Sequence, residues 1–155
     1  MEKVVLTGKV FDTDKVLPSG NYYPKKVVDK ALKEFQERLK TETVYGKIGD
    51  LDHPENLQEY NNSLFTDTSH KVVSVKEKDN SVFVEVELLN TTDGEIVKKC
   101  IENKVPMKFT MRAIGDLNGY KEVLNFDITS IDIVQCKDND NIENTIKVKK
   151  NKKLF

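Results

Sequence analysis

The sequence contains little cysteine and no long apolar run. Only two of its 155 residues are cysteines, Cys100 and Cys136, and they lie far apart without the C-x-x-C spacing of metal sites and redox pairs. No apolar segment approaches the roughly 20 residues of a membrane-spanning helix, and the N-terminus lacks the features of a signal peptide. We therefore expect no metal, no cofactor and no membrane contact, and two reduced, partly buried thiols in a protein made inside a cell.

The sequence also carries almost no net charge. Its 25 Lys and Arg residues nearly balance 26 Asp and Glu residues, which leaves a formal net charge of -1 at pH 7. Proteins that bind nucleic acid through its phosphates carry an excess of basic residues, so this balance predicts no nucleic-acid partner. The length and the 37% hydrophobic content fit one globular domain.

The first half of the chain alternates between strand and helix patterns. β-branched residues predict a strand over 4–11, and apolar residues at helical spacing predict an amphipathic helix over 24–40 that begins near Pro24. A short strand broken by glycines follows over 43–54. The segment from Glu55 to Asp67 has loop composition. The next segment alternates again, with two β-branched runs around the turn "KDNS", and predicts a β-hairpin.

The second half repeats this alternation. Thr92 or Asp93 is expected to cap a second, short helix, and strands are expected over 105–115 and 123–136. The polar remainder, 137–155, ends in a basic run and is expected to be a tail or docking arm behind one domain over 1–136. This order predicts an α+β fold with an antiparallel or mixed sheet, or a barrel-like core, flanked by two or more helices.

Two histidines carry the first hint of chemistry. His53 lies in "GDLDHP" and His70 in "TSHKVV". A histidine can take the proton of a hydroxyl nucleophile, and a second histidine or a carboxylate can orient the first. The alternative is structural, one histidine at a turn and the other on a strand face. Spacing alone favours this alternative, because catalytic constellations are recognised by geometry and not by sequence order.

Three further residues are candidates for such a site. Arg112 follows Thr110 by two residues, so both project to one side of a strand, where Arg112 could hold an oxyanion or a neighbouring carboxylate. Asp127 and Asp132 interrupt an otherwise apolar strand, and either could orient a histidine. The alternatives are a surface arginine at a strand end and exposed carboxylates on a half-buried strand.

Six segments, taken in order, resemble the prohead (head maturation) serine proteases of tailed phages, which share a fold with the herpesvirus capsid assembly protease. These segments are "SGNYYPKKVVDKAL", "GDLDHP", "TSHKVV", "LLNTTDGEIV", "KFTMRAIG" and "NFDITSIDIV". The resemblance covers roughly Val4 to Gln135. It implies a protease-like fold in which His53 is the catalytic histidine, His70 the second histidine, and the strand with Thr110 and Arg112 the nucleophile strand.

The chain departs from this family at the nucleophile. The family's serine pair aligns with Thr110 and Met111. Methionine has no hydroxyl, and the extra methyl of threonine restricts χ1 and crowds the approach to a scissile carbonyl. The third catalytic member could be His70, Asp127 or Asp132, and analogy with the pair of histidines in the herpesvirus enzyme favours His70.

Two functions remain open on this resemblance. In the first, slightly favoured by the missing serine pair, the fold serves as a catalytically impaired, structural or auxiliary head protein. In the second, the chain is an active maturation protease that cleaves scaffold and capsid proteins, with Thr110 as nucleophile and His53 as base. Both imply capsid or scaffold proteins as partners in the prohead or virion head of an infected bacterium, and leave homo-oligomers open. A third class is a domain of unrelated role with the same fold.

Overall fold

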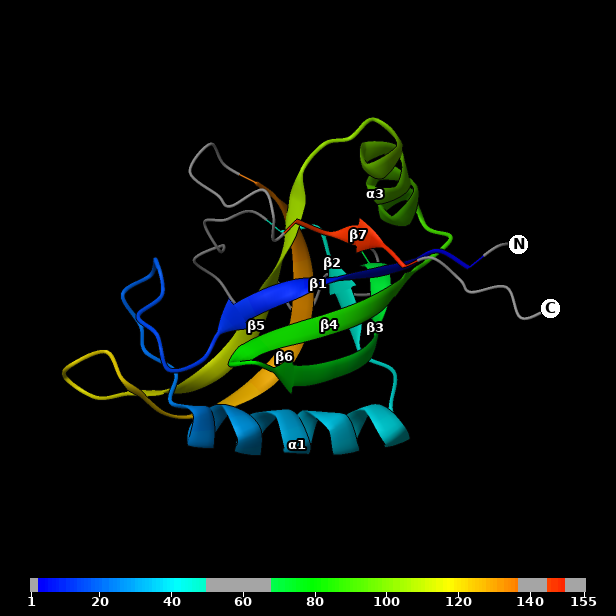
Figure 1. Cartoon of the computed structure of the whole chain (residues 1–155). Coiled ribbons are helices and arrows are strands. Elements are labelled where there is room, and N and C mark those ends of the chain that lie inside the picture. Colours follow the sequence, from blue (N-terminus) through cyan, green and yellow to red (C-terminus); the bar gives the residue numbers. More distant parts are fainter. Residues whose placement is uncertain (1–2, 50–67, 137–144, 150–155) are drawn as a thin grey trace.

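The computed structural model describes residues 3–49, 68–136 and 145–149, and it has the expected α+β architecture (Figure 1). In this part of the chain two helices flank a five-stranded sheet of order β2-β3-β4-β1-β7 and a two-stranded sheet of β5 and β6. All strand pairs within both sheets are antiparallel. The elements are β1 (Val5–Asp12), α1 (Lys25–Thr41), β2 (Tyr45–Lys47), β3 (Thr68–Lys78), β4 (Ser81–Leu88), α3 (Thr92–Glu102), β5 (Met107–Leu117), β6 (Val123–Gln135) and β7 (Lys147–Val148).

Helix α1 forms where the apolar spacing predicts it. Its buried residues Val28, Ala31, Leu32 and Phe35 recur every three or four positions and so share one face. Pro24 occupies the N-cap, where its missing N–H costs the helix nothing. The buried face packs against β3 and β6, and α1 lies at the bottom of the view in Figure 1.

Strands β3 and β4 form the predicted hairpin. Asp79 and Asn80 at its tip both have positive φ, 52° and 61°, as a two-residue turn with the twist of a hairpin requires. Along β4, alternate side chains at 82, 84 and 86 are valines no more than 1% exposed. This face therefore covers the core, as the period-2 pattern predicts.

Helix α3 begins one residue earlier than expected, because its N-cap is Thr91 and not Thr92 or Asp93. The Thr91 Oγ1 accepts from the Gly94 N–H at 3.0 Å and donates to the Thr68 carbonyl at 2.6 Å. The Thr91 hydroxyl thus bonds both a helix N–H and a strand carbonyl. The second bond depends on the tertiary fold, so local capping preferences do not predict which threonine is the N-cap. Thr91 thereby ties α3 to β3.

The two sheets join into a barrel-like core. At one seam Ile48 pairs with Ile133 of β6, and the Gly49 N–H donates to the Ile133 carbonyl at 2.9 Å. At the other seam the Ile146 N–H donates to the Met107 carbonyl at 2.9 Å, just before β7 pairs with β1. Residues 145–149, which the sequence groups with a tail or docking arm, therefore lie on the barrel.

The interior of this barrel holds one apolar core. It includes Leu6, Phe11, Val28, Phe35, Val72, Val84, Val86, Phe109, Phe126, Ile131 and Ile133. Both cysteines are reduced and partly buried, as expected. In the described part of the chain no helix is long and apolar enough to cross a bilayer. The loop expected from Glu55 to Asp67 lies outside the described residues.

Candidate active site

Thr110 lies in the middle of β5, directly opposite Asp132 of β6. Residues that face one another across an antiparallel pair project to the same side of the sheet. Arg112, two residues along β5, projects to that side as well. Thr110 is half-buried, whereas the exposed fractions of Arg112 and Asp132 are 3% and 0%. The pairing of β5 with β6 therefore gathers a hydroxyl, a guanidinium and a carboxylate on one face.

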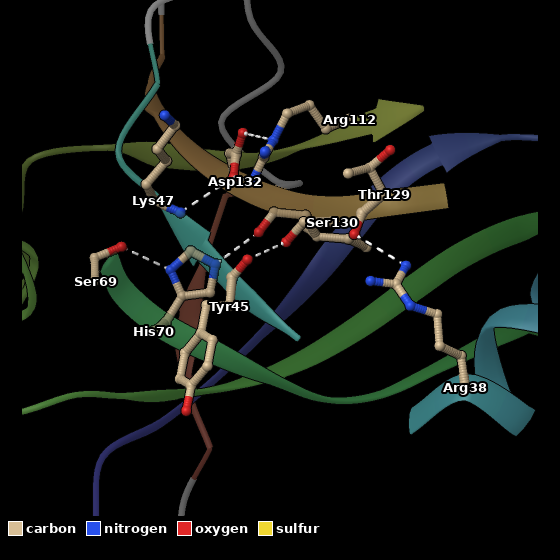
Figure 2. A network of polar contacts seen from close by, with 10 residues as sticks. Arg38, Tyr45, Lys47, Ser69, His70, Arg112, Thr129, Ser130 and Asp132 are labelled. Atoms are coloured by element: carbon tan, nitrogen blue, oxygen red, sulfur yellow. Dashed lines mark hydrogen bonds and ion pairs between the residues drawn. The ribbon is translucent and has the colours of Figure 1, made fainter. Parts of the chain in front are cut away.

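Arg112 and Asp132 form a two-pronged ion pair. The Arg112 Nε donates to Asp132 Oδ2 at 2.8 Å, and Arg112 Nη2 donates to Oδ1 at 3.0 Å. Figure 2 shows the guanidinium turned toward the carboxylate. Such parallel hydrogen bonds fix the orientation of both groups. Arg112 is thus no surface arginine: it holds a neighbouring carboxylate, one of the two roles expected for it.

The same carboxylate also receives a bond from strand β2. The Lys47 backbone N–H donates to Asp132 Oδ1 at 3.1 Å, and the Ser130 hydroxyl of β6 donates to the Tyr45 carbonyl at 2.6 Å. Side chains of β6 thus satisfy backbone groups along the outer edge of β2, where a neighbouring strand would otherwise pair. Asp132 is held from β5 and from β2 together.

His70 of β3 lies entirely inside the protein, with an exposed fraction of 0%. Its Nε2 is 2.7 Å from the Ile131 carbonyl oxygen, and its Nδ1 is 2.7 Å from the Ser69 Oγ. A carbonyl can only accept, so Nε2 carries the proton and Nδ1 accepts from the Ser69 hydroxyl. Both ring nitrogens are therefore engaged in buried hydrogen bonds (Figure 2).

Burial lowers the pKa of His70 to about 4, because a charged imidazolium loses its hydration there. The hydrogen bond to Ile131 and the Asp132 carboxylate raise this pKa by less, and the Arg112 guanidinium lowers it further. His70 is consequently neutral at pH 7.

Gly46 leaves the space that the His70 ring occupies. It pairs with His70 in the β2–β3 register, and a Cβ at position 46 would overlap both His70 Nε2 and the Ile131 carbonyl oxygen. Only a glycine leaves room for this hydrogen bond. Glycines interrupt this strand in the sequence, and a glycine inside a strand is the signal that could have pointed to a close approach here.

The candidate residues thus fall into three groups. Thr110, Arg112 and Asp132 lie together, and His70 contacts the residue that precedes Asp132. Asp127 is exposed on β6, where it lines a shallow groove of about 430 Å³ beside α1. His53 lies outside the described residues. Within the described ranges, no group of His, Cys, Asp and Glu side chains could hold a metal ion.

Neither a protein-family model nor a curated protein matches this chain. Among solved structures, its fold resembles the bacteriophage T4 capsid assembly protease, gp21, with a TM-score of 0.70. The two sequences are 19% identical, and the match covers 85% of this chain and 81% of that one. The chain therefore has a prohead-protease-like fold, as the order of its motifs predicts.

Proposed function

We propose that this protein acts in the assembly of a phage head, as an endopeptidase that cleaves capsid or scaffold proteins with the Thr110 hydroxyl as nucleophile. The observation that carries the proposal is the placement of Thr110 opposite a carboxylate that Arg112 orients inside the protein. A buried ion pair adds little net stability compared with apolar residues of the same size. We therefore infer that the Arg112–Asp132 pair serves to orient the Asp132 carboxylate toward the site. The likeness of the fold to a capsid assembly protease supports capsid or scaffold proteins as the substrate class.

The proposed reaction is a two-step acyl transfer. Thr110 Oγ1 attacks the scissile carbonyl carbon while His53 takes the hydroxyl proton as general base. The C–N bond then breaks, the same proton passes to the leaving amine, and an ester to Thr110 remains. Water hydrolyses this ester and restores the hydroxyl. The Thr110 proton thus ends on the released amine, and water supplies the proton that restores the Thr110 hydroxyl.

His53 is within chain reach of this site. It follows Gly49 by four residues, and Gly49 is hydrogen-bonded to Ile133, the neighbour of Asp132. Four extended residues span at most about 14 Å. In the proposed mechanism Asp132 is the third member, because a carboxylate that Arg112 holds in place offsets part of the positive charge that His53 gains during attack.

A second candidate function is that of a structural or auxiliary head protein. Threonine in place of serine favours it, because the extra methyl crowds the attacking oxygen. Exposed apolar side chains on two neighbouring segments also favour it, since exposed apolar surface is common where proteins bind one another. Within the described residues these are Val16, from the loop bonded to the β5–β6 turn, and Ile114, Leu117, Tyr120 and Leu124 of the β5–β6 hairpin, exposed by 50% or more.

Incubation with the phage's own capsid and scaffold proteins, read by mass spectrometry, separates the two functions. We expect the parent chain and Thr110→Ser to cut, and Thr110→Ala to lose about a thousandfold or more in rate. Cleavage by Thr110→Ser alone would mean that the threonine silences an intact site, and the structural function would replace the proposed one. Cleavage that survives in Thr110→Ala would remove Thr110 from the chemistry.

A further inference from the structure

His70 connects two strands that are not neighbours in a sheet. It belongs to β3, and its ring reaches past β2 to the Ile131 carbonyl of β6. Figure 2 shows the ring between Ser69 on one side and β6 on the other. The ring lies against Gly46, where any side chain would overlap it. Strand β2 is therefore shaped to let His70 bridge β3 and β6.

The bridge lies one residue from the carboxylate of the candidate site. Ile131 precedes Asp132 in β6, and Gly46 precedes Lys47, whose N–H donates to Asp132. The bonds from His70 to Ile131 and from Lys47 to Asp132 therefore end on consecutive residues of β6. The first holds β6 to β3 and the second holds it to β2, next to the position where Asp132 faces Thr110.

The hydrogen bonds of His70 leave its ring no nitrogen for proton exchange with a substrate. The Nδ1 lone pair accepts from Ser69, and the Nε2–H donates to Ile131. The side chain has no exposed surface, so neither water nor a peptide reaches it. A catalytic acid or base must come within hydrogen-bond reach of the proton that it moves, and this ring does not meet that requirement.

We propose that His70 is a positioning residue, a clamp that holds β6 to β3 across β2 so that Asp132 stays opposite Thr110, and not a third catalytic member. The catalytic consequence rests on the proposed function of Thr110. The clamp itself is a property of the fold, so it can be tested by a measurement that does not require protease activity.

Three variants at position 70 test the clamp. His70→Gln keeps an N–H donor near the place of Nε2 but has no ionisable ring. His70→Asn carries a shorter amide that reaches Ser69 but not Ile131, and His70→Ala has neither bond. The matched control is Gln36→Ala, which removes another side-chain bond to a strand carbonyl, that from Gln36 to Val75 at 2.8 Å, outside the Thr110 site.

The first readout is amide hydrogen exchange of the full chain by NMR, with Val84 of β4 as the internal reference for global stability. Loss of one hydrogen bond at the seam should speed exchange of the Lys47 amide about five- to tenfold relative to Val84 in the Asn and Ala variants. In the Gln variant and in Gln36→Ala the ratio should change by less than about twofold. An unchanged ratio in both the Asn and Ala variants would overturn the clamp, and if the Ala variant does not fold, the Asn variant decides.

The second readout is cleavage of capsid or scaffold protein. We expect His70→Gln to keep kcat within about tenfold and His70→Asn to lose about a hundredfold, because a displacement of about 1 Å is enough for that loss. If the Gln variant loses as much as the Asn variant while its Lys47 amide stays protected, His70 takes part in proton transfer and the proposal is wrong. A parent chain that never cleaves, with the Lys47 results as predicted, would refute the protease function and leave the clamp standing.

Discussion

Beside Thr110, two opposite charges lie almost entirely out of water. Removing one member of the Arg112–Asp132 pair takes its two-pronged ion pair away from the other buried charge, which costs about 3–5 kcal/mol of unfolding free energy. We therefore expect Arg112→Met to lose that much in urea unfolding. The double variant Arg112→Met with Asp132→Leu should recover at least half of the loss, because neither of these two charges is then buried without the other.

The control for this prediction is a Lys–Asp ion pair that is partly open to solvent. Lys9 and Asp12 approach to 3.1 Å, with side chains 22% and 24% exposed. Lys9→Met should cost no more than about 1 kcal/mol, since water screens such pairs. A similar small cost for Arg112→Met would contradict the view that Asp132 depends on Arg112 for its charge balance.

The buried His70 makes stability depend on pH. The pKa of His70 is about 4 in the folded protein and 6.5 for the free side chain. Between these two pH values the unfolded chain therefore binds a proton at His70, whereas the folded chain does not. The contribution is complete above pH 6.5 and falls by about 3 kcal/mol as the pH drops to about 4.

His70→Gln removes this titration and leaves the buried charges that act on the ring, Asp132 and Arg112, in place. In urea unfolding at pH 7 and pH 4.5, we expect the stability difference between parent and Gln variant to shrink by about 2–3 kcal/mol at the lower pH. A difference that stays constant would mean that His70 is protonated as easily inside the protein as in water.

At the scale of an element, Thr91 is the residue on which the start of α3 depends. Its hydroxyl serves both the helix and β3, so Thr91→Ala should cost about 1–2 kcal/mol. The neighbouring Thr92→Ala is the control and should change stability by less than about 0.5 kcal/mol. Equal costs at both positions in thermal or urea unfolding would return the cap to Thr92, where the sequence pattern put it.

The β5–β6 hairpin explains why the sequence revealed both strands and the candidate residues but not the pairing of Thr110 with Asp132. Alternation of apolar residues predicts both strands. Two bulges, however, shift the register between the turn, where Leu117 pairs with Val123, and the site, where Thr110 pairs with Asp132. Counting back from the turn without bulges would set Thr110 opposite Ser130. Bulges depend on packing of the whole sheet, which no local pattern records.

Other features of the fold likewise differ in whether local sequence or distant residues determine them. Helix α1 and the β3–β4 hairpin follow from period and turn chemistry, which are local. The bonds of His70 depend on Gly46 and on Ile131, residues 24 positions before it and 61 after it along the chain. The order of the motifs indicated the fold and named Thr110, Arg112 and His70 as candidates. Only the assembled barrel shows that Arg112 lies beside Thr110, whereas His70 bonds the backbone next to Asp132.

At the scale of the whole molecule, closure of the barrel depends on residues 145–149. Besides the Ile146 bond to Met107, the Lys149 N–H donates to the Val5 carbonyl at 2.8 Å, and Ile146 packs on the core. A chain that ends after residue 144 leaves the edge of β1 unpaired. It should lose about 2–4 kcal/mol in urea unfolding and associate at high concentration.

The control is a chain that ends after Lys149, which keeps β7 whole. We expect its unfolding free energy to match that of the full chain within about 0.5 kcal/mol. If the chain that ends after residue 144 is as stable as the full chain, closure through β7 contributes nothing and the remaining four strands β2-β3-β4-β1 are stable with an open edge.

The central claim is that Thr110 is a working nucleophile, and covalent labelling tests it without a known substrate. A fluorophosphonate ester phosphonylates an activated hydroxyl with loss of fluoride, and intact-mass analysis with peptide mapping locates the adduct. We predict one adduct per chain, on Thr110, that forms faster in Thr110→Ser and is absent in Thr110→Ala. An unlabelled parent chain beside a labelled Thr110→Ser variant would contradict the claim and leave a protease fold whose threonine does no chemistry.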